Sequence, residues 1–355
     1  MMQPLFSLAR AAINRVSDFR YHRAFRDEAM TILRSIESVH GRTNPEHIKA
    51  SDQYAADVLG WGGYAPWLYV YSAVQGRFRE GWIPDNYYGK VVIPVIQADY
   101  RVLSSMKSLS RRLLGSDLFP DLASHVNGLF LSPDHEVIQP SAVPGLLFSD
   151  SDTVVFKRDR SGRGSNVVFL HKSSFDVSLV RRLGSGVFQQ PIVQHPIFAR
   201  LMPSSAATLR FTTVVEDDGT VSLRDAYLRL GRSGETHVKS DSQVKVCIDL
   251  ESGRLDPSGY LANWLTVDRH PDTGVEFAGT TIPEFSACVS AAKQLHSACP
   301  AVRCVGWDMI VDEHSRVRVM EWNSSHNGIK FSEATKGPCF ADLGWEKLWR
   351  RRAAG

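Results

Sequence analysis

The first 40 residues alternate apolar and basic positions at the spacing of an α-helix. Apolar side chains recur every three or four residues, at Leu8, Ala12, Ile13, Val16, Ala29, Ile32, Leu33 and Ile36. Arginines lie between them, at Arg10, Arg15, Arg20, Arg23, Arg26 and Arg34. The pattern predicts a basic amphipathic helix. Such a helix either makes weak contact with an anionic membrane surface or simply presents a solvated arginine face.

Residues 60–98 differ in character, because tryptophan and tyrosine cluster there with glycine, proline and asparagine. Aromatic rings beside glycines can stack on a sugar or a flat ring, or they can pack a loop-rich subdomain. Residues 99–114 return to helical spacing and carry four basic side chains. We therefore expect a helical, aromatic-rich N-terminal region over residues 1–114.

Beyond Leu118 the apolar positions alternate with the period of two that is typical of strands. The expected hairpins cover 152–170, 208–230 and 304–323. An amphipathic helix is expected over 284–299, ended by Pro300. This mixture predicts an α+β protein, with divisions at 1–114, 115–190, 191–345 and a basic tail at 346–355.

Composition narrows the functional classes without selecting one. The formal net charge is only +3, so bulk electrostatics give no support to a nucleic-acid partner. Apolar runs stay shorter than the roughly 20 residues of a membrane span, and the arginines of the first 15 residues do not suit a secretory signal. Five cysteines without a CxxC pair indicate buried thiols in a reducing compartment: Cys247, Cys288, Cys299, Cys304 and Cys339. We expect a cytoplasmic protein of open oligomeric state.

The hairpin over 304–323 carries polar side chains where strands usually carry apolar ones. Glu321 and Asn323 project to one side, because strand side chains alternate. If the turn is tight, Asp308 lies opposite Val319, one diagonal step from Glu321 on the same face. Two carboxylates and an amide oxygen would then suit Mg²⁺, with nucleotide phosphates as further ligands. The alternative is a solvated sheet face that bears acids by chance.

A lysine followed by a loop of small residues forms a second candidate site. Lys157 ends the strand 152–157, and the loop after it contains Gly162, Arg163, Gly164 and Ser165. Backbone N–H groups of glycines can approach phosphate oxygens closely, and Lys157 would add a positive charge there. The loop is neither a P-loop nor a Rossmann fingerprint, because GxxxxGK[ST] is absent and no helix opens at the glycines.

Arg210 is the third candidate, on the expected strand 208–215. Facing a phosphate site, it would stabilise the γ-phosphoryl group and the tetrahedral charge that builds during transfer. The alternative role is that of a salt-bridge partner or an exposed edge charge. Arg229 on the paired strand is a further candidate.

Taken in this order, the features resemble the ATP-grasp superfamily over about residues 115–330, and most of all its subgroup found beside sugar-transfer and polysaccharide genes. The motifs that carry the resemblance are Val155-Phe156-Lys157 with Gly162–Asn166, Val193-Gln194-His195-Pro196, Thr208-Leu209-Arg210, Gly306-Trp307-Asp308 and Glu321-Trp322-Asn323. The resemblance implies an ATP-grasp fold, in which two α+β subdomains sandwich ATP.

The resemblance also implies a role for each matched residue. Lys157 would touch the phosphates beneath the flap of Gly162, Arg163, Gly164 and Ser165, and the backbone near Gln194 and His195 would meet the adenine. Mg²⁺ would be held by Asp308, Glu321 and Asn323, with Glu321 bridging two ions. Arg210 would face an acyl phosphate, so that Arg210 and Lys157 would be the catalytic residues.

The implied activity is that of an ATP-dependent carboxylate–amine ligase, which forms an amide through an acyl phosphate and releases ADP. Its substrates would be a small carboxylate and an amine, drawn from polysaccharide precursors or small peptide-like metabolites. Two alternatives stay open. One is a phosphotransferase that uses the same ATP site on a hydroxyl group, and the other is a nucleotide-binding module with degraded catalysis.

Overall fold

The computed structural model describes residues 3–161, 167–235, 238–239 and 242–353. The chain forms two compact units. One comprises Met1–Val95, Asn263–Leu265 and Gly328–Gly355, and the other comprises Ile96–Ala262 and Thr266–Asn327. The predicted α+β class is confirmed, because the first unit is helical and the second contains two antiparallel sheets.

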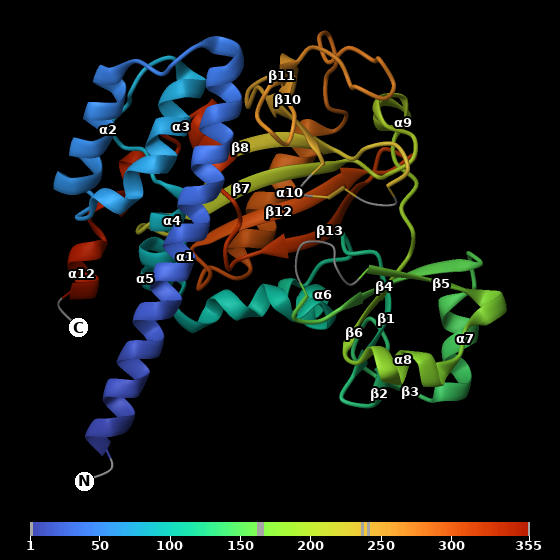
Figure 1. Cartoon of the computed structure of the whole chain (residues 1–355). Helices are drawn as coiled ribbons and strands as arrows, with labels where there is room; N and C mark the ends of the chain where they lie inside the picture. The colour runs from blue at the N-terminus through green and yellow to red at the C-terminus, as the bar shows by residue number, and fades with distance from the viewer. Residues whose placement is uncertain (1–2, 162–166, 236–237, 240–241, 354–355) are drawn as a thin grey trace. The chain divides into compact units, whose positions relative to one another are not determined.

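Helices dominate the first unit (Figure 1). They are α1 (Gln3–His40), α2 (Pro45–Asp57), α3 (Ala65–Gln75), α4 (Asp85–Tyr87), α11 (Lys330–Thr335) and α12 (Trp349–Ala353). Helix α1 buries Ala29, Ile32, Leu33 and Ile36, which confirms the helical spacing predicted there. Aromatic side chains fill the interior, with Trp67, Tyr71, Trp82 and Tyr87 fully buried. These aromatics of the 60–98 stretch therefore pack a core.

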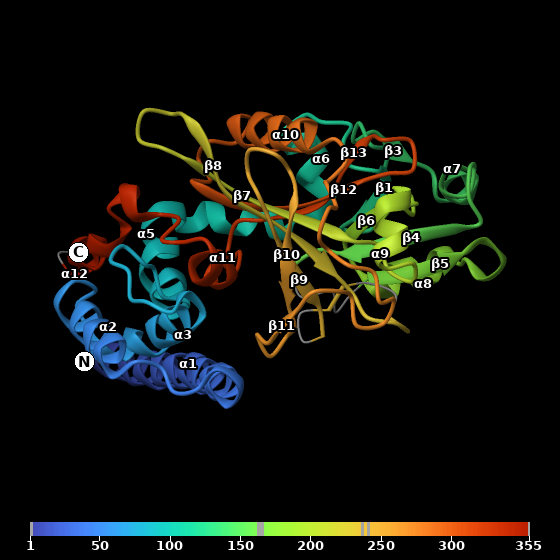
Figure 2. The same ribbon diagram turned by 90° about the horizontal axis from the view of Figure 1, so that it is seen from above.

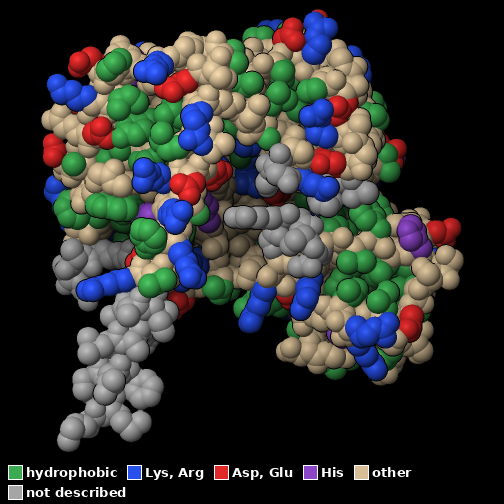
Figure 3. All heavy atoms as spheres, in the orientation of Figure 1, with side chains coloured by type: hydrophobic (Ala, Val, Ile, Leu, Met, Phe, Trp, Pro, Cys, Tyr) green, Lys and Arg blue, Asp and Glu red, His purple; other side chains and the backbone are tan. Residues whose placement is uncertain are grey.

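The surface carries both signs of charge. On the face shown in Figure 3, Lys and Arg side chains are interspersed with Asp and Glu side chains, as the small net charge leads one to expect. Within the described residues, no helix combines the length and the apolar character needed to cross a membrane. All five cysteines are free thiols, and four of them are buried.

A six-stranded sheet lies in the second unit, with the order β3-β2-β1-β6-β4-β5. Its strands are β1 (Asp121–Val126), β2 (Leu129–Leu131), β3 (Val137–Ile138), β4 (Thr153–Arg158), β5 (Val167–His171) and β6 (Gly186–Gln189). The expected hairpin over 152–170 is the pair β4 and β5. Helices α7 (Val143–Leu147) and α8 (Val177–Leu183) cover this sheet (Figure 1), where Val143 and Val180 join a core of Phe130, Phe156 and Phe188.

A seven-stranded sheet in the same unit has the order β11-β10-β9-β8-β7-β12-β13. Its strands are β7 (Thr208–Val215), β8 (Val221–Leu230), β9 (Val244–Ile248), β10 (Leu255–Tyr260), β11 (Thr266–Val267), β12 (Cys304–Val311) and β13 (Val317–Asn323). Besides α7 and α8, the unit contains the helices α5 (Ile93–Gln97, at its boundary), α6 (Ser110–Leu114), α9 (Pro196–Leu201) and α10 (Phe285–Ser297). Two predicted hairpins, 208–230 and 304–323, and the helix predicted at 284–299 are confirmed.

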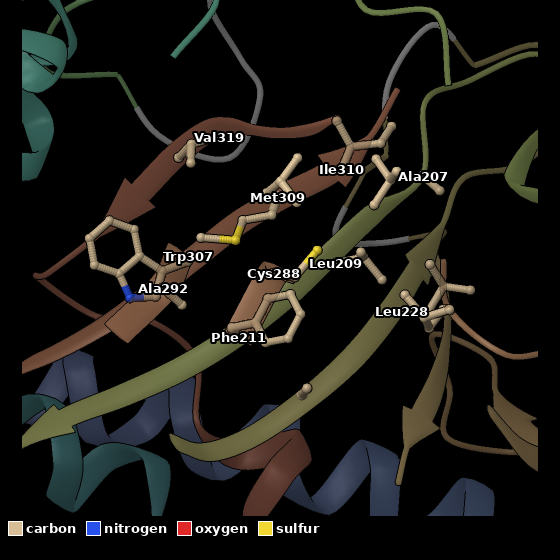
Figure 4. Packing of buried hydrophobic residues seen from close by; sticks show 14 of the residues in the cluster. Ala207, Leu209, Phe211, Leu228, Cys288, Ala292, Trp307, Met309, Ile310 and Val319 are labelled. Carbon is tan, nitrogen blue, oxygen red and sulfur yellow. The ribbon is translucent and has the colours of Figure 1, made fainter. Parts of the chain in front are cut away.

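Helix α10 lies across one face of this sheet (Figure 2). Phe211 and Trp307 belong to the same core cluster as Cys288 and Ala292 of that helix (Figure 4). Each large apolar side chain buried in this way contributes roughly 1.5–3 kcal/mol to folding. Because strand side chains alternate, the neighbouring residues Arg210 and Asp308 project from the opposite face. The apolar core thus fixes the orientation of the polar face.

Candidate functional site

The candidate site is built on the polar face of the seven-stranded sheet. Arg210 of β7 lies in register with Asp308 of β12 on one side and with Tyr227 of β8 on the other. Directly opposed residues of antiparallel strands point to the same face, with Cβ atoms about 5 Å apart. The pairing therefore places a guanidinium beside a carboxylate, one strand in from the edge strand β13.

Arg210 binds Asp308 through two hydrogen bonds. Its Nε lies 2.6 Å from Oδ1 and its Nη2 lies 3.0 Å from Oδ2. Both residues are buried, with 8% and 4% of their surface exposed. Burial alone would raise the pKa of Asp308, but Arg210 and the nearby Arg229 hold that pKa below its ordinary value. Burial likewise opposes the charge of Arg210, but Asp308 raises the Arg210 pKa above its ordinary value. Both groups are therefore ionised.

The hairpin of β12 and β13 brings Asp308 and Glu321 to one face, in a register that differs from the predicted one. Asp308 lies directly opposite Glu321, so the prediction of Val319 at this place is wrong. The turn is wider than expected, since the Asp312 N–H donates to the Arg316 carbonyl. A β-bulge next to Asp308 then shifts the pairing once more. The two shifts together move the pairing by two positions, so Asp308 and Glu321 still share a face.

Oxygen-bearing side chains on this face fit a hard cation by their chemistry. Asn323 lies close to the acids, with its Nδ2 3.3 Å from Asp308 Oδ2. Within the described part of the chain, no group of three or more His, Cys, Asp or Glu side chains is arranged to hold a metal ion. The set here has two acids and one amide, and Arg210 already engages both oxygens of Asp308. Glu321, whose side chain is 33% exposed, is the carboxylate most open to a metal ion.

Two lysines approach Glu321. Lys157, near the end of β4, donates a hydrogen bond of 3.0 Å to the Met320 carbonyl. Lys107 Nζ lies 3.5 Å from Glu321 Oε2 and 3.0 Å from the Ser161 carbonyl. Burial lowers the pKa of Lys157, an effect that Glu321 partly opposes. The lysines and Glu321 line a small pocket, whose other walls are Ser104, Ser110, Phe119, Gln189, Met320 and Trp322.

The residues expected to form the phosphate flap, Gly162, Arg163, Gly164 and Ser165, lie outside the described residues. The strands on either side are described, and they pair Lys157 with Val167. Lys157 therefore lies at the loop end of the β4–β5 hairpin, on the strand that leads into the loop.

Sequence reasoning missed two residues that position Arg210. Its Nη1 donates a hydrogen bond of 2.7 Å to the Asn327 carbonyl. The guanidinium also lies where a side chain at position 306 would project. A Cβ added to Gly306 would lie 2.9 Å from the Asn327 Cβ and 3.2 Å from Arg210 Nη1. The Gly-Trp-Asp motif and the Asn that follows Glu-Trp-Asn were visible signals, but only the packing shows that they meet at Arg210.

Lys107 was also missed as a site residue. In the sequence it is one of several basic side chains in a stretch of helical spacing, where a solvated face is the usual interpretation. The stretch forms short helical turns instead, and one of them brings Lys107 to Glu321.

Arg229 of β8 lies on the same face of the sheet. Its Nη1 lies 3.5 Å from Asp308 Oδ1, and its Nε donates a hydrogen bond of 2.7 Å to Gln243 Oε1. Two guanidinium groups, those of Arg210 and Arg229, therefore share the single carboxylate of Asp308.

The segment expected to meet adenine is anchored to the β12–β13 hairpin. The His195 N–H donates to the Val311 carbonyl at 3.0 Å, and the His195 imidazole accepts from the Ile197 N–H at 3.3 Å. The Gln194 side chain bonds to the Met202 and Ser205 carbonyls and to the Ala207 N–H. These polar groups are thus engaged within the protein. Residues 190–193 line a pocket, together with Pro120, Asp312, Glu313, His314, Arg316 and Arg318.

The chain matches a known family over part of its length. The family model described as sugar-transfer associated ATP-grasp covers residues 170–342. No curated protein matches the sequence. Among solved structures, biotin carboxylase from Campylobacter jejuni, as a β,γ-ATP complex, shares 10% identity, with 90% of this chain and 67% of that chain covered and a TM-score of 0.44.

Two further structures show the same level of similarity. The biotin carboxylase domain of 2-oxoglutarate carboxylase from Hydrogenobacter thermophilus shares 12% identity, with 71% and 46% of the two chains covered and a TM-score of 0.43. The L-amino acid ligase from Bacillus licheniformis shares 13% identity, with 70% and 49% covered and a TM-score of 0.41. This chain spans about half the length of these two proteins.

The matched segment contains Arg210, Asp308, Glu321 and Asn323, and it begins after Lys157. The short motifs that suggested the resemblance thus lie largely inside the segment that the family model recognises. Over residues 170–342, a little under half of its length, the chain thus resembles the sugar-transfer associated ATP-grasp family.

Proposed function

We propose that the chain is an ATP-dependent carboxylate–amine ligase that activates its acid as an acyl phosphate. The observation that carries this proposal is the placement of Arg210. It is a permanent cation, fixed by Asp308 in the sheet and close to the oxygen-bearing side chains of β13. A fixed cation at this place can stabilise the charge of an acyl phosphate and of the tetrahedral adduct that follows it.

The charge balance of the site supports a polyphosphate ligand. Four cationic groups lie near three carboxylates. The cations are Lys107, Lys157, Arg210 and Arg229, and the acids are Asp308, Glu321 and Asp121, whose pKa burial raises to about 6. A surplus of positive charge in a partly buried site is unfavourable without a compensating anion. The phosphates of a nucleotide would supply that anion.

In this proposal, each residue of the site has a separate role. Lys157 and Lys107 bind the phosphates, and Arg210 holds the acyl phosphate. Glu321 and Asn323, with Asp308, would hold Mg²⁺, which supplies neutralising charge to the phosphates when it is bound.

We place the adenine base in the pocket lined by residues 190–193. The polar groups of Gln194 and His195 are already engaged within the protein, whereas Gln190 and Val193, which line the pocket, have exposed side chains. The nucleotide would thus lie between the stretches 115–190 and 191–345, which we assign as its two binding subdomains.

The reaction begins with transfer of the γ-phosphoryl group of ATP to a carboxylate oxygen of the acid, and ADP leaves. The amine nitrogen then attacks the acyl carbon and forms the C–N bond. Phosphate departs with the oxygen to which it was bound, and the nitrogen loses a proton. Arg210 lies where the negative charge of this adduct would develop. This scheme needs no side-chain nucleophile.

We propose that the substrates are polysaccharide precursors, with which the sugar-transfer association of the matched family agrees, or small peptide-like metabolites. The five free thiols fit a reducing compartment such as the cytoplasm.

Trapping by hydroxylamine tests the ligase directly. The full chain is incubated with ATP, Mg²⁺, hydroxylamine and a panel of acids, and both hydroxamate and ADP are measured. We expect hydroxamate and ADP in equal amounts, with both dependent on the acid. ADP release that depends on an alcohol and yields a phosphate ester would contradict the proposal in favour of a phosphotransferase. Tight ATP binding without turnover on any acid would indicate a binding module instead.

A further inference from the structure

We propose that Asp159 is a positioning residue for phosphate binding. By holding Ser108, it fixes the adjacent Lys107 beside Glu321 and the end of β4. Asp159 would thus act through Lys107 and make no contact of its own with the nucleotide. This inference rests on the proposed nucleotide site and adds a residue to it, two positions after Lys157 in the sequence.

Lys107 lies in a segment that has little regular structure of its own. Two short 3₁₀ turns, Ala98–Ser105 and Lys107–Leu109, meet at Met106. The backbone of Met106 has φ −92° and ψ 73°, outside the helical region, so no continuous helix runs through this segment. Turns of this kind have poorer hydrogen-bond geometry than an α-helix. The place of Lys107 therefore depends on contacts with other parts of the chain.

Asp159 and its neighbour supply such contacts on both sides of Lys107. Asp159 Oδ1 accepts a hydrogen bond of 3.0 Å from the Ser108 N–H, and its Oδ2 accepts one of 2.7 Å from the Ser108 hydroxyl. The Arg160 N–H donates to the Ser105 carbonyl at 2.6 Å. Hydrogen bonds to a carboxylate are stronger than those between neutral groups. Asp159 thus makes a strong connection between this segment and the residues that follow β4.

The ammonium of Lys107 depends on this placement. Its Nζ donates a hydrogen bond of 3.0 Å to the Ser161 carbonyl and lies 3.5 Å from Glu321 Oε2. Only 13% of the Lys107 side chain is exposed, so water offers little replacement for these two partners. Ser104 Oγ accepts a hydrogen bond of 3.0 Å from the Ser324 N–H, which ties the segment to the end of β13 as well. A shift of the segment would move the ammonium away from the proposed phosphates.

The charge of Asp159 and its hydrogen bonds would have opposite effects on an anionic ligand. Removing a negative charge near the phosphates would by itself strengthen their binding, because like charges repel. The two hydrogen bonds to Ser108 hold a cation in place and therefore favour binding. Asparagine has the shape of aspartate, and its amide group can accept from the Ser108 N–H and donate to the hydroxyl without a charge. Asparagine and alanine at this position thus separate the two effects.

Titration of a non-hydrolysable ATP analogue with Mg²⁺ into the full chain tests the inference and needs no turnover. We expect Asp159→Ala to raise the Kd about tenfold. We expect Asp159→Asn to leave the Kd unchanged or to lower it. If Asp159→Ala binds the analogue as tightly as the original chain, or if Asp159→Asn binds as weakly as Asp159→Ala, the inference is wrong.

Asp176→Ala is the matched control. Asp176 also accepts hydrogen bonds from the N–H and the hydroxyl of a single serine, Ser178, but it does so at the start of α8. Both alanine variants lose the same kind of contacts, so we expect both to lower the melting temperature. Only Asp159→Ala should weaken binding of the analogue. An equal rise of the Kd in both variants would indicate a general loss of structure and overturn the inference.

A double variant shows whether Asp159 acts through Lys107. Lys107→Met removes the ammonium, and we expect it to raise the Kd about tenfold. Asp159→Ala in the Lys107→Met background should then cause little further change, because the group that Asp159 positions is gone. If the effects of the two substitutions are additive, Asp159 does not act through Lys107 and the inference is wrong.

Binding and turnover together separate this inference from the ligase function. Binding of the analogue that depends on Asp159 in the expected way, without hydroxamate from any acid, would support the inference and overturn the ligase function. Hydroxamate formation together with binding that is insensitive to Asp159→Ala would overturn the inference and leave the ligase function intact.

Discussion

Arg210 keeps its orientation through hydrogen bonds to both oxygens of Asp308 and to the Asn327 carbonyl. Three acceptors in different directions match the planar fork of a guanidinium, and a lysine ammonium cannot reproduce this geometry. Because the ion pair is buried, removing one partner would leave an uncompensated charge and destabilise the fold by about 3–5 kcal/mol. A variant that keeps the positive charge therefore separates catalysis from stability.

Arg210→Lys should lower hydroxamate formation at least about a hundredfold, because the charge stays but its position changes. Binding of ATP should change only a few-fold, since Lys107 and Lys157 supply the phosphate contacts in our proposal. Steady-state assays and nucleotide titration measure the two effects. Arg254→Lys, at an exposed position, is the control. Activity of Arg210→Lys close to that of the original chain would remove Arg210 from the catalytic role.

Lys157 predicts a pH dependence of nucleotide binding. Burial lowers the pKa of Lys157 in the free protein, and phosphates would return it toward or above its ordinary value of about 10.4. Below the free-protein pKa, Lys157 is charged in both states, so affinity is maximal there. As pH rises between the free and the bound pKa values, affinity should fall by up to about tenfold per pH unit.

Titrations of the ATP analogue from neutral to alkaline pH measure this dependence. Lys157→Met should bind the analogue more weakly and lose this part of the pH dependence. If the affinity of the Lys157→Met variant falls with pH as steeply as that of the original chain, the pH dependence comes from another group.

At the scale of elements, strand β12 has one apolar face and one face that carries the candidate site. At Gly306 of this strand, Arg210 and Asn327 occupy the space that a side chain would need. Gly306→Ala adds a methyl group 2.9 Å from the Asn327 Cβ and 3.2 Å from Arg210 Nη1. We expect a loss of turnover of about tenfold or more, because small displacements of a positioned group are costly in catalysis. The same change at Gly145, where a Cβ would meet no atom within 4 Å, is the control. If neither Gly306→Ala nor Gly145→Ala changes the turnover, Arg210 tolerates displacement and the prediction is wrong.

Helix α10 is tied to the sheet by a buried polar network. The Trp307 indole donates to Thr213 Oγ1 at 2.8 Å, and Thr213 Oγ1 lies 2.7 Å from His296 Nδ1. The His296 Nε2 lies 2.6 Å from the Val302 carbonyl, so Nε2 carries the proton and Nδ1 accepts from the hydroxyl. This arrangement requires a neutral imidazole, and burial lowers the pKa of His296 to about 4.

The lowered pKa predicts acid sensitivity of the fold. The unfolded chain binds the proton at about pH 6.5 and the folded chain only near pH 4, so stability is complete above pH 6.5 and falls as pH drops through this window. The loss from His296 is about 3 kcal/mol in total. Urea unfolding at pH 7 and pH 4.5 measures it. His296→Gln should reduce the difference between the two pH values, and an unchanged difference would show that other groups cause it.

At the scale of the whole molecule, the sequence predicts local elements well and long-range connections poorly. The hairpins over 208–230 and 304–323 were predictable because alternation of apolar positions is a local signal. The sequence did not predict that residues 263–265 and 328–355 belong to the helical unit, because contacts between distant segments leave no periodic pattern. The bulge that places Glu321 opposite Asp308 has no signature of its own in this hairpin.

The residues of the candidate site were also predictable only where the signal is local in the sequence. Arg210, Asp308 and Glu321 were predictable because charged side chains within apolar strands are unusual. Lys107 was not, because a lysine in a basic helical stretch resembles an ordinary solvated residue until its partner at 3.5 Å is known.

The central claim is that the acid is activated as an acyl phosphate, and an isotope measurement tests it most directly. An acid that gives hydroxamate is labelled with ¹⁸O in its carboxylate and incubated with the full chain, ATP, Mg²⁺ and hydroxylamine. We predict one ¹⁸O atom in each phosphate released, because the oxygen that accepts the phosphoryl group leaves with it. Hydroxamate formed together with unlabelled phosphate would contradict the account.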